Sequence, residues 1–256
     1  MKIWIASDLH LEFGNPFVPT VQPGEADVCV CAGDVRTKGV VPTIQWLAET
    51  IAIYMPVVLV AGNHEFYSAS LNEGIRDGRE VAARFPNVHF LENQSVEIGD
   101  VRFIGCTLWT DFRLGGRDPT FAMEDVAKGM NDYKRIKYEK LPFRKLKPIH
   151  TLRKHLESRA FIAAELASCS DKTAVVLTHH APSIRSIPSW DRGDPVVSAY
   201  ASHLEPLILE AQPRLWIHGH VHHRNEYRIG DTLVLSNPRG YPGQKTGFDP
   251  NLIIEV

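Results

Sequence analysis

Side chains with metal-binding chemistry recur at five places in this chain, each directly after an apolar run. The first pair is Asp8 and His10, which are two residues apart and would point the same way in an extended segment. The remaining candidates are Asp34, Asn63 and His64, His179, and His220 with His222. Carboxylates, an amide and imidazoles suit divalent first-row transition metals better than calcium, which prefers oxygen ligands alone. The pattern therefore predicts a site for a pair of divalent ions that needs no cysteine.

The strands that would carry these side chains are predicted from apolar runs rich in β-branched residues and bounded by turn residues. These runs cover residues 2–7, 27–32, 56–61, 88–92, 101–108, 173–177, 215–218, 224–229, 232–236 and 252–256, and helical patterns cover residues 43–54, 71–85, 151–168 and 198–211. Strands and helices alternate over the first third of the chain, which indicates βαβ units and a largely parallel sheet. Residues 229–232 are typical of a hairpin turn. Since ligands collect at the carboxyl ends of parallel strands, we expect the clusters to meet there.

Length and composition indicate a single domain over residues 1–256. With 44% hydrophobic and 23% charged residues, the chain can bury one substantial core. Its formal net charge of -2 gives no global attraction to nucleic acid or to anionic membranes. The apolar stretches are too short to span a bilayer and the N-terminus lacks the apolar region of a signal peptide, so we expect a cytoplasmic protein without membrane contact. Four cysteines without metal-site spacing are expected to be buried and reduced: Cys29, Cys31, Cys106 and Cys169.

Residues 109–158 differ in composition and are interpreted as an inserted, helical, cap-like segment. Between Met130 and Lys154 there are nine basic and two acidic residues, a local net charge of +7. A solvated helical face is one interpretation, and a positive rim that attracts an anionic substrate is the other. Under the second interpretation, nucleic acid or nucleotide partners would bind through this basic insertion. The sequence gives no indication of the oligomeric state.

The chain resembles the calcineurin-like metallophosphoesterase superfamily, whose motifs D-x-H, G-D, G-N-H-E, H and G-H-x-H occur here in order. The matching residues are Asp8 to His10, Gly33 and Asp34, Gly62 to Glu65, His179, and Gly219 to His222. The resemblance spans residues 8–222 and implies an α/β fold, a four-layer αββα sandwich. It also implies one metal site formed by Asp8, His10, Asp34 and His222, and a second formed by Asp34, Asn63, His179 and His220. Asp34 would bridge the two.

The resemblance further implies two divalent metal ions, drawn from Mn, Fe, Zn and Co, with Mn favoured. Such ions lower the pKa of bound water to roughly 7 and can hold both the nucleophile and the phosphoryl oxygens. We therefore expect a hydrolase that cleaves a phosphate ester by attack of a metal-bridging hydroxide, with Asp34 and His64 as catalytic residues. His64 matches the family position beside the substrate phosphate, where it would stabilise charge or protonate the leaving alkoxide. The alternative for His64 is an orienting role, and Glu65 could either orient His64 or form a salt bridge at a helix N-terminus.

Three assignments around the metal ligands stay open. His179 and His180 are adjacent, and the family pattern favours His179 as the ligand, which leaves His180 to support the site or to face the substrate. His218 would become a ligand if the register shifted by two, although the G-H-x-H motif argues against that shift. Asn63, His180 and Arg239 are predicted to contact the substrate. Because Arg239 lies in a loop after the last hairpin, a purely structural role is its alternative.

The substrate is predicted to be a phosphodiester, since a histidine at the position of His64 is common among the diesterases of the superfamily. Phosphomonoesters and nucleotide pyrophosphates are alternatives with the same site. The lipid pyrophosphatases of the superfamily typically have Arg and Asp where this chain has His64 and Glu65, which argues against a lipid substrate. A metal-binding interaction scaffold is the non-enzyme alternative. Scaffold members usually lack metal ligands, whereas all seven are present here.

Overall fold

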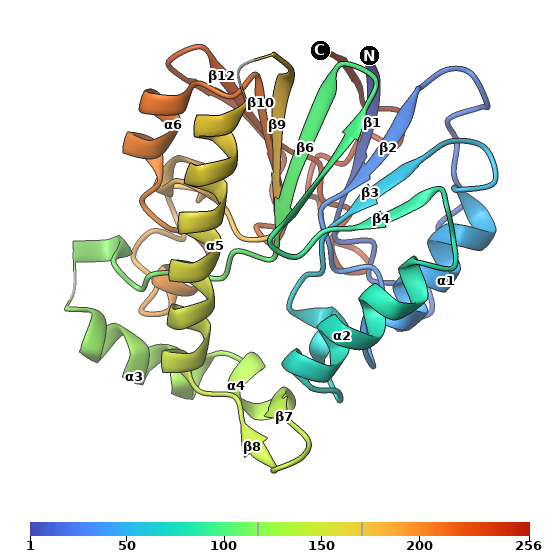
Figure 1. The fold of residues 1–256 in the computed structure, drawn as a ribbon. Coiled ribbons are helices and arrows are strands. Elements are labelled where there is room, and N and C mark those ends of the chain that lie inside the picture. The colour runs from blue at the N-terminus through green and yellow to red at the C-terminus, as the bar shows by residue number, and fades with distance from the viewer. Residues whose placement is uncertain (117, 170) are drawn as a thin grey trace.

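The chain folds into two β-sheets that lie face to face, with helices on both outer faces (Figure 1). The computed structural model describes residues 1–116, 118–169 and 171–256. The first sheet has the strand order β13-β1-β2-β3-β4. Its strands are β1 (Lys2–Ala6), β2 (Val28–Cys31), β3 (Val57–Leu59), β4 (Val88–Phe90) and β13 (Ile253–Glu255). Strands β1 to β4 run parallel, as predicted, and β13 pairs antiparallel with β1.

The second sheet has the order β11-β12-β10-β9-β6-β5. Its strands are β5 (Gln94–Ile98), β6 (Val101–Cys106), β9 (Thr173–Thr178), β10 (Leu215–His218), β11 (Asn225–Ile229) and β12 (Thr232–Ser236). The four central strands run parallel, and β5 and β11 are antiparallel edges. Ile229 pairs with Thr232 across the predicted hairpin turn, which confirms that turn.

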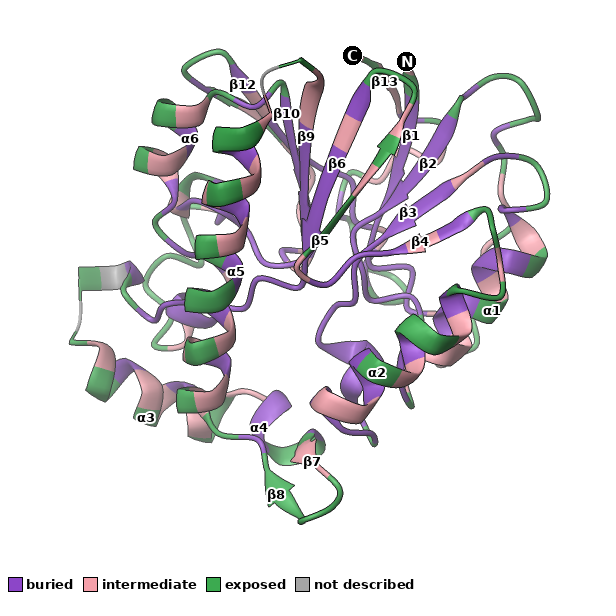
Figure 2. Ribbon diagram, in the orientation of Figure 1, coloured by how far each residue is buried: buried purple, intermediate pink, exposed green. Residues whose placement is uncertain are grey.

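Apolar packing between the two sheets explains why their central strands read as continuous hydrophobic runs. Ile5 and Val58 of the first sheet lie in one buried cluster with Phe103, Leu177 and Ile217 of the second. The opposite faces of the same strands are covered by helices, so these strands are buried on both sides. In Figure 2 the strands near the middle of the molecule are mostly buried, and each long helix has one buried and one exposed face.

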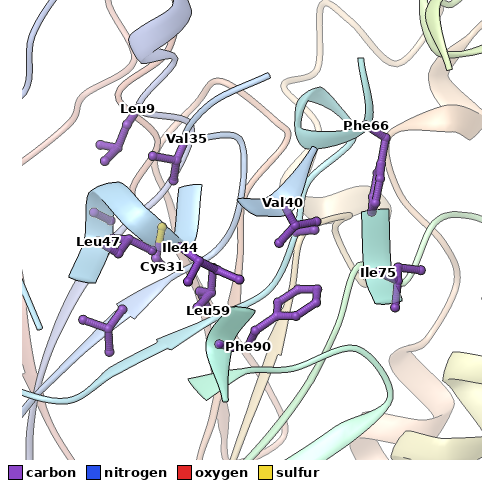
Figure 3. Packing of buried hydrophobic residues seen from close by; sticks show 14 of the residues in the cluster. Leu9, Cys31, Val35, Val40, Ile44, Leu47, Leu59, Phe66, Ile75 and Phe90 are labelled. Atoms are coloured by element: carbon purple, nitrogen blue, oxygen red, sulfur yellow. The ribbon is translucent and has the colours of Figure 1, made fainter. Parts of the chain in front are cut away.

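Two pairs of helices complete the sandwich. The helices α1 (Val40–Thr50) and α2 (Leu71–Ala82) cover the first sheet. In α1 the buried positions Val40, Ile44, Leu47 and Ala48 recur at helical spacing and pack on that sheet, as Figure 3 shows for three of them. The helices α5 (Pro148–Ser168) and α6 (Glu205–Ala211) cover the second sheet. The predicted αββα sandwich is therefore confirmed.

The segment 109–158 is more varied than the sequence suggested. It contains α3 (Pro119–Gly129), the short α4 (Asp132–Arg135), and a small sheet of β7 (Lys137–Glu139) and β8 (Arg144–Lys145). It also includes the first half of α5, which continues without interruption to Ser168. A helical basic insertion is thus not confirmed, and the extents of the domain and of the insertion stay predictions.

Two further expectations concern membranes and thiols. Among the described residues, no helix is both long and apolar enough to cross a bilayer. All four cysteines are free: Cys29, Cys31 and Cys106 are buried, and Cys169 is half-buried. Burial raises the pKa of the thiols of Cys29 and Cys106 well above its ordinary value, so these two groups stay protonated.

Candidate metal centre

Five loops at the carboxyl ends of parallel strands carry the candidate ligands. In the first sheet, Asp8 and His10 follow β1, Asp34 follows β2, and Asn63 and His64 follow β3. In the second sheet, loops after β9 and β10 carry His179, His180, His220 and His222. Side chains from both sheets contact one another at this edge, so the fold brings together all seven residues that the sequence suggested as metal ligands.

The first group of candidate ligands joins the β1 loop to the β10 loop. Asp8, His10 and His222 each offer an atom within 4.8 Å of the atoms offered by the other two. His222 Nε2 lies 3.1 Å from His10 Nε2 and 3.4 Å from Asp8 Oδ1. Asp8 Oδ2 is buried and has no hydrogen-bond partner in the described part of the chain. A single cation could therefore contact all three side chains.

The second group is centred on Asn63. Its Oδ1 lies 3.0 Å from His179 Nε2 and 3.1 Å from His220 Nδ1. His179 Nδ1 donates to the Ala32 carbonyl at 2.7 Å, so its Nε2 carries a lone pair and meets another acceptor. His220 Nε2 is buried and, within the described residues, has no hydrogen-bond partner.

Asp34 lies between the two groups. Its Oδ2 is 3.8 Å from His10 Nε2 in the first group, and its Oδ1 is 3.5 Å from His179 Nε2 in the second. The Oδ1 atom also accepts the backbone amide of His64 at 2.8 Å, which fixes the orientation of the carboxylate. One carboxylate thus reaches both sets of nitrogens.

The hydrogen bonds of the imidazoles in the first group leave lone pairs facing each other. His10 Nδ1 donates to the Glu12 carboxylate at 3.1 Å. His222 Nδ1 donates to Gln244 Oε1 at 2.7 Å, an oxygen that also accepts the backbone amide of Tyr241. Both Nε2 atoms are therefore acceptors, yet they are only 3.1 Å apart. A divalent cation between the two Nε2 atoms would replace the repulsion of their lone pairs by coordination. In metal-binding histidines the ring nitrogen that does not bind the metal usually donates a hydrogen bond, as Nδ1 does in both residues here.

The buried carboxylates of the centre require nearby positive charge to be stable as anions. Asp8, Asp34 and Glu65 are all buried. Burial raises the pKa of Asp34, and the neighbouring carboxylates Glu65 and Asp8 raise it further. Burial also opposes ionisation of Asp8, but the nearby imidazoles, His222 first among them, lower its pKa below the ordinary value. Divalent cations would stabilise these charges, and the mixed oxygen and nitrogen donors fit transition-metal ions.

The backbone is strained where it presents four of the seven candidate ligands. The φ angles of Asp8, His10, Asp34 and His220 are 52°, 46°, 56° and 64°. This left-handed region is unfavourable for residues other than glycine. The loops also approach closely at Gly62, where an added Cβ would overlap Asp34 Oδ1. Bulk at that position would therefore displace the carboxylate that joins the two groups.

Glu65 connects the loops that follow β2 and β3. Its two oxygens accept the backbone amides of Asp34, Val35 and Gly62 at 2.7 to 2.9 Å and the Thr43 hydroxyl at 2.9 Å. The described residues include no bond from Glu65 to the His64 side chain and no salt bridge at a helix N-terminus. Glu65 therefore makes neither of the interactions considered from the sequence, and it instead fixes the backbone on which Asp34 stands.

His64 is held on three sides. Its Nδ1 donates at 2.8 Å to Glu12 Oε1, the oxygen that also accepts His10 Nδ1. Its ring stacks on Tyr67 with centroids 4.2 Å apart, and its Nε2 lies 3.2 Å from the Tyr241 hydroxyl. Burial opposes ionisation of Glu12, but the bonds from His10 and His64 lower its pKa to about 2, so it is a carboxylate at neutral pH. Glu12 was not predicted as a site residue, and its only signal in the sequence is its short spacing from His10.

The segment 109–158 contributes one side chain to the support of the centre. Asp132, at the start of α4, is buried, and its Oδ1 accepts Asn63 Nδ2 and the Tyr67 hydroxyl, each at 2.8 Å. The bond from Nδ2 settles which atom of the Asn63 amide is the oxygen, and it turns Oδ1 toward His179 and His220. No role in the site was predicted for Asp132, which entered only the charge count of the stretch 130–154.

Two residues suggested for substrate contact are bonded to backbone carbonyls of the protein. His180 is buried, donates from Nδ1 to the Thr107 carbonyl at 3.1 Å, and packs against Trp109 and His220. The Arg239 guanidinium donates to three carbonyl oxygens of the stretch 9–16. This geometry supports structural roles for both. His218 points to the Ser186 hydroxyl at 2.9 Å, which agrees with the register that excludes it as a ligand.

A cavity of about 430 Å³ opens beside the ligands. Asp34, Asn63, His64, His220 and His222 form one side of it. Further walls come from the end of α3, from the stretch 187–194 and from the loop that carries Tyr241 and Gln244. This volume lies within the usual range for small-molecule sites.

The αββα fold with paired groups of nitrogen and oxygen ligands is that of a metal-dependent hydrolase. A model of the calcineurin-like phosphoesterase family matches residues 1–224. The chain belongs to this family, whose members use divalent metal ions. It is accordingly an enzyme that hydrolyses phosphate esters.

Two known proteins illustrate the likeness. Over 274 residues, the chain is 26% identical to an uncharacterized protein of Acanthamoeba polyphaga mimivirus, a match that covers 98% of this chain and 95% of the viral protein. The structure of the present chain is similar to the crystal structure of phosphopantetheinyl hydrolase from Mycobacterium tuberculosis. The TM-score is 0.72 and the sequence identity 16%, and the match covers 94% of this chain and 90% of the hydrolase. At this low identity, the structural likeness concerns the fold alone.

Proposed function

We propose that the protein is a phosphodiesterase with two divalent metal ions at the centre described above. One ion would be held by Asp8, His10, Asp34 and His222, and the other by Asp34, Asn63, His179 and His220. The observation that carries this proposal is the position of Asp34, with one oxygen 3.8 Å from His10 Nε2 and the other 3.5 Å from His179 Nε2. Such a carboxylate suits the role of a bridging ligand.

Bound at this centre, divalent ions would lower the pKa of a water molecule and neutralise charge on the phosphoryl oxygens. Among Mn, Fe, Zn and Co we favour Mn, because three of the seven ligands, Asp8, Asp34 and Asn63, offer oxygen atoms. Carboxylate and carbonyl oxygens suit Mn, whereas imidazoles alone would favour Zn or Fe.

His64 is the proposed proton donor. Hydrolysis of a diester forms a P–O bond to a water oxygen and breaks the P–O bond to the leaving alcohol, whose oxygen gains a proton. His64 lines the cavity, and among the described residues the hydrogen-bond partner of its Nε2 is the Tyr241 hydroxyl, at 3.2 Å. Because ionised Glu12 accepts Nδ1–H, the second proton of an imidazolium would sit on Nε2 and point to the leaving oxygen.

A diester is supported over the alternatives by the cavity beside the ligands. Its volume of about 430 Å³ gives room for a second organic group on the phosphate in addition to the leaving alcohol. A monoester or a nucleotide pyrophosphate would use the same ligands and remains the second candidate. The scaffold alternative has no support, since every ligand motif is present.

Chromogenic esters test this proposal. The protein is loaded with Mn²⁺, Fe²⁺, Zn²⁺ or Co²⁺ in turn and assayed with bis(p-nitrophenyl) phosphate and p-nitrophenyl phosphate, and bound metal is counted by elemental analysis. We expect two ions per chain and a higher kcat/KM for the diester. Asp8→Asn should lose metal and activity, whereas the matched change Asp231→Asn, at an exposed hairpin turn, should lose neither. A preference for the monoester would establish the second candidate, and no hydrolysis with any metal would overturn the proposal.

A further inference from the structure

Outside the metal centre, the described side chains that line the cavity include carboxylates but no lysine or arginine. Apart from the centre itself, the charged residues that line it are Asp191 and Asp194, both exposed at its rim. No lysine or arginine lines the cavity within the described residues. We infer that the substrate carries its only negative charge on the phosphate that is cleaved, and that its second organic group is uncharged or cationic. This inference rests on the proposed phosphodiesterase function and specifies its substrate class.

Of the basic residues in the stretch 130–154, Arg135 comes near the cavity: its guanidinium lies 5.5 Å from the ring centroid of the lining residue Tyr67, but Arg135 does not itself line the cavity. Met130 and Asn131 line the cavity, but none of the nine basic residues after them does. Two of those residues are engaged elsewhere: Arg144 pairs with Glu139 at 2.6 Å, and Lys154 pairs with Glu157 at 2.8 Å. The small sheet β7-β8, which holds several others, projects from the end of the molecule (Figure 1). The positive rim considered from the sequence is therefore not part of the cavity wall.

One arginine lies between the two aspartates in sequence, and its guanidinium is bonded to the backbone of Ile187, a residue that lines the cavity. Arg192 donates from Nε to the Ile187 carbonyl at 2.9 Å and does not line the cavity. Asp194 Oδ1 accepts the Val196 amide at 2.8 Å, which fixes the turn that presents this carboxylate. The charge at the rim is thus set by the aspartates.

The remaining wall is uncharged, with the amides of Asn131 and Gln244 beside apolar and aromatic side chains. Met130, Ile187, Pro188 and Val221 line the cavity together with the rings of Tyr200 and Tyr241. Apolar surface of this kind binds carbon-rich groups, and tyrosine hydroxyls add hydrogen bonds without adding charge. The metal ions and imidazoles can balance the single charge of a diester, but a second phosphate would face Asp191 and Asp194 with no lysine or arginine among the described lining residues to contact it.

A matched pair of nucleotide esters tests the inference. The p-nitrophenyl ester of thymidine 5′-phosphate and the same compound with an added 3′-phosphate release the same leaving group and differ only by a remote dianion. For charge separations on the order of 10 Å in water, we expect the wild-type kcat/KM to be about fivefold to tenfold higher for the ester without the 3′-phosphate at low salt. In the double variant Asp191→Asn and Asp194→Asn, the ratio should narrow to about twofold. Added salt should narrow it in the wild type as well.

The control is Asp231→Asn, which removes one carboxylate at the far end of β12 and should leave the wild-type ratio unchanged. A wild-type preference for the 3′-phosphorylated ester, or a ratio that the double variant leaves unchanged, would overturn the inference while the proposed function stands. If neither ester is hydrolysed, the proposed function fails. The inference is then decided by calorimetric binding of the corresponding methyl esters to the Mn²⁺-loaded protein, where equal affinities would overturn it.

Discussion

Replacing Asp132 should weaken metal binding although Asp132 is not a proposed ligand. Its carboxylate accepts Asn63 Nδ2 at 2.8 Å, and that bond directs Asn63 Oδ1 toward His179 and His220. In Asp132→Ala the amide of Asn63 loses this restraint. If it rotates, its NH₂ group will donate to His179 Nε2 and occupy the lone pair that a metal needs.

The expected loss of metal affinity follows from the single hydrogen bond between Asp132 and Asn63 that is removed. A hydrogen bond to a charged acceptor contributes about 1.5 to 3 kcal/mol, and removal of such supporting partners typically lowers metal affinity about 10-fold to 100-fold. We expect a loss in this range for the ion held by Asn63 and little change for the other. Asp132→Asn keeps an oxygen acceptor and should lose less.

Calorimetric titration of metal-free protein with Mn²⁺ gives the two affinities, and thermal unfolding of the same samples shows whether the variants fold. Glu124→Gln is the matched control, because it removes an exposed carboxylate from the neighbouring helix α3. Two Mn²⁺ ions bound with wild-type affinity by Asp132→Ala would refute the reasoning. A loss of both ions together with a large fall in unfolding temperature would show that Asp132 acts on the fold instead.

Three other substitutions probe the centre and the core. Asp34→Asn removes charge shared by both ion sites, so turnover should vanish and metal content should fall; retention of two ions and wild-type activity would contradict the bridging role. His64→Ala should keep metal content and lower kcat about 10²-fold to 10⁴-fold for alkyl esters, but less for nitrophenyl esters, whose leaving group needs no proton; equal losses would argue against proton donation. Phe103→Ala, at a fully buried position between the sheets, should lower the free energy of unfolding by about 3 to 5 kcal/mol in denaturant titrations, and a change below 1 kcal/mol would be inconsistent with the packing described.

The sequence predicted the strands well where both of their faces are buried. The bounds of β10 and β12 agree with prediction, because strands between a sheet and a helix layer are continuous apolar runs flanked by turns. The edge strand β5 was missed, since its residues are mostly exposed and polar positions dominate. The helix expected over 198–211 begins only at Glu205, before Pro206. A proline disfavours helical backbone in the residue before it and is favourable in the first turn of a helix. Pro206 therefore indicated the start of this helix, which the spacing of apolar residues did not show.

The ligands of the candidate centre were accessible from sequence motifs, but the side chains that hold them were not. Glu12, Asp132 and Gln244 bond to His64, Asn63 and His222 across loops that are far apart along the chain or lack regular structure. Loops and helices of three or four residues are too short to show a periodicity, so nothing in the sequence distinguishes such a partner from a solvated side chain. Only the folded arrangement of the two sheets identifies these pairs.

The left-handed backbone at four proposed ligands implies a trade-off between catalytic activity and thermal stability. These residues are Asp8, His10, Asp34 and His220. Each such residue costs of order 1 to 3 kcal/mol, and the surrounding fold must supply that energy. A glycine at any of these positions would relax the strain at once, even as it removes a proposed ligand. Selection for heat resistance alone would therefore tolerate the loss of ligands, and a library screened only for folding should include changes to glycine at these positions that abolish activity.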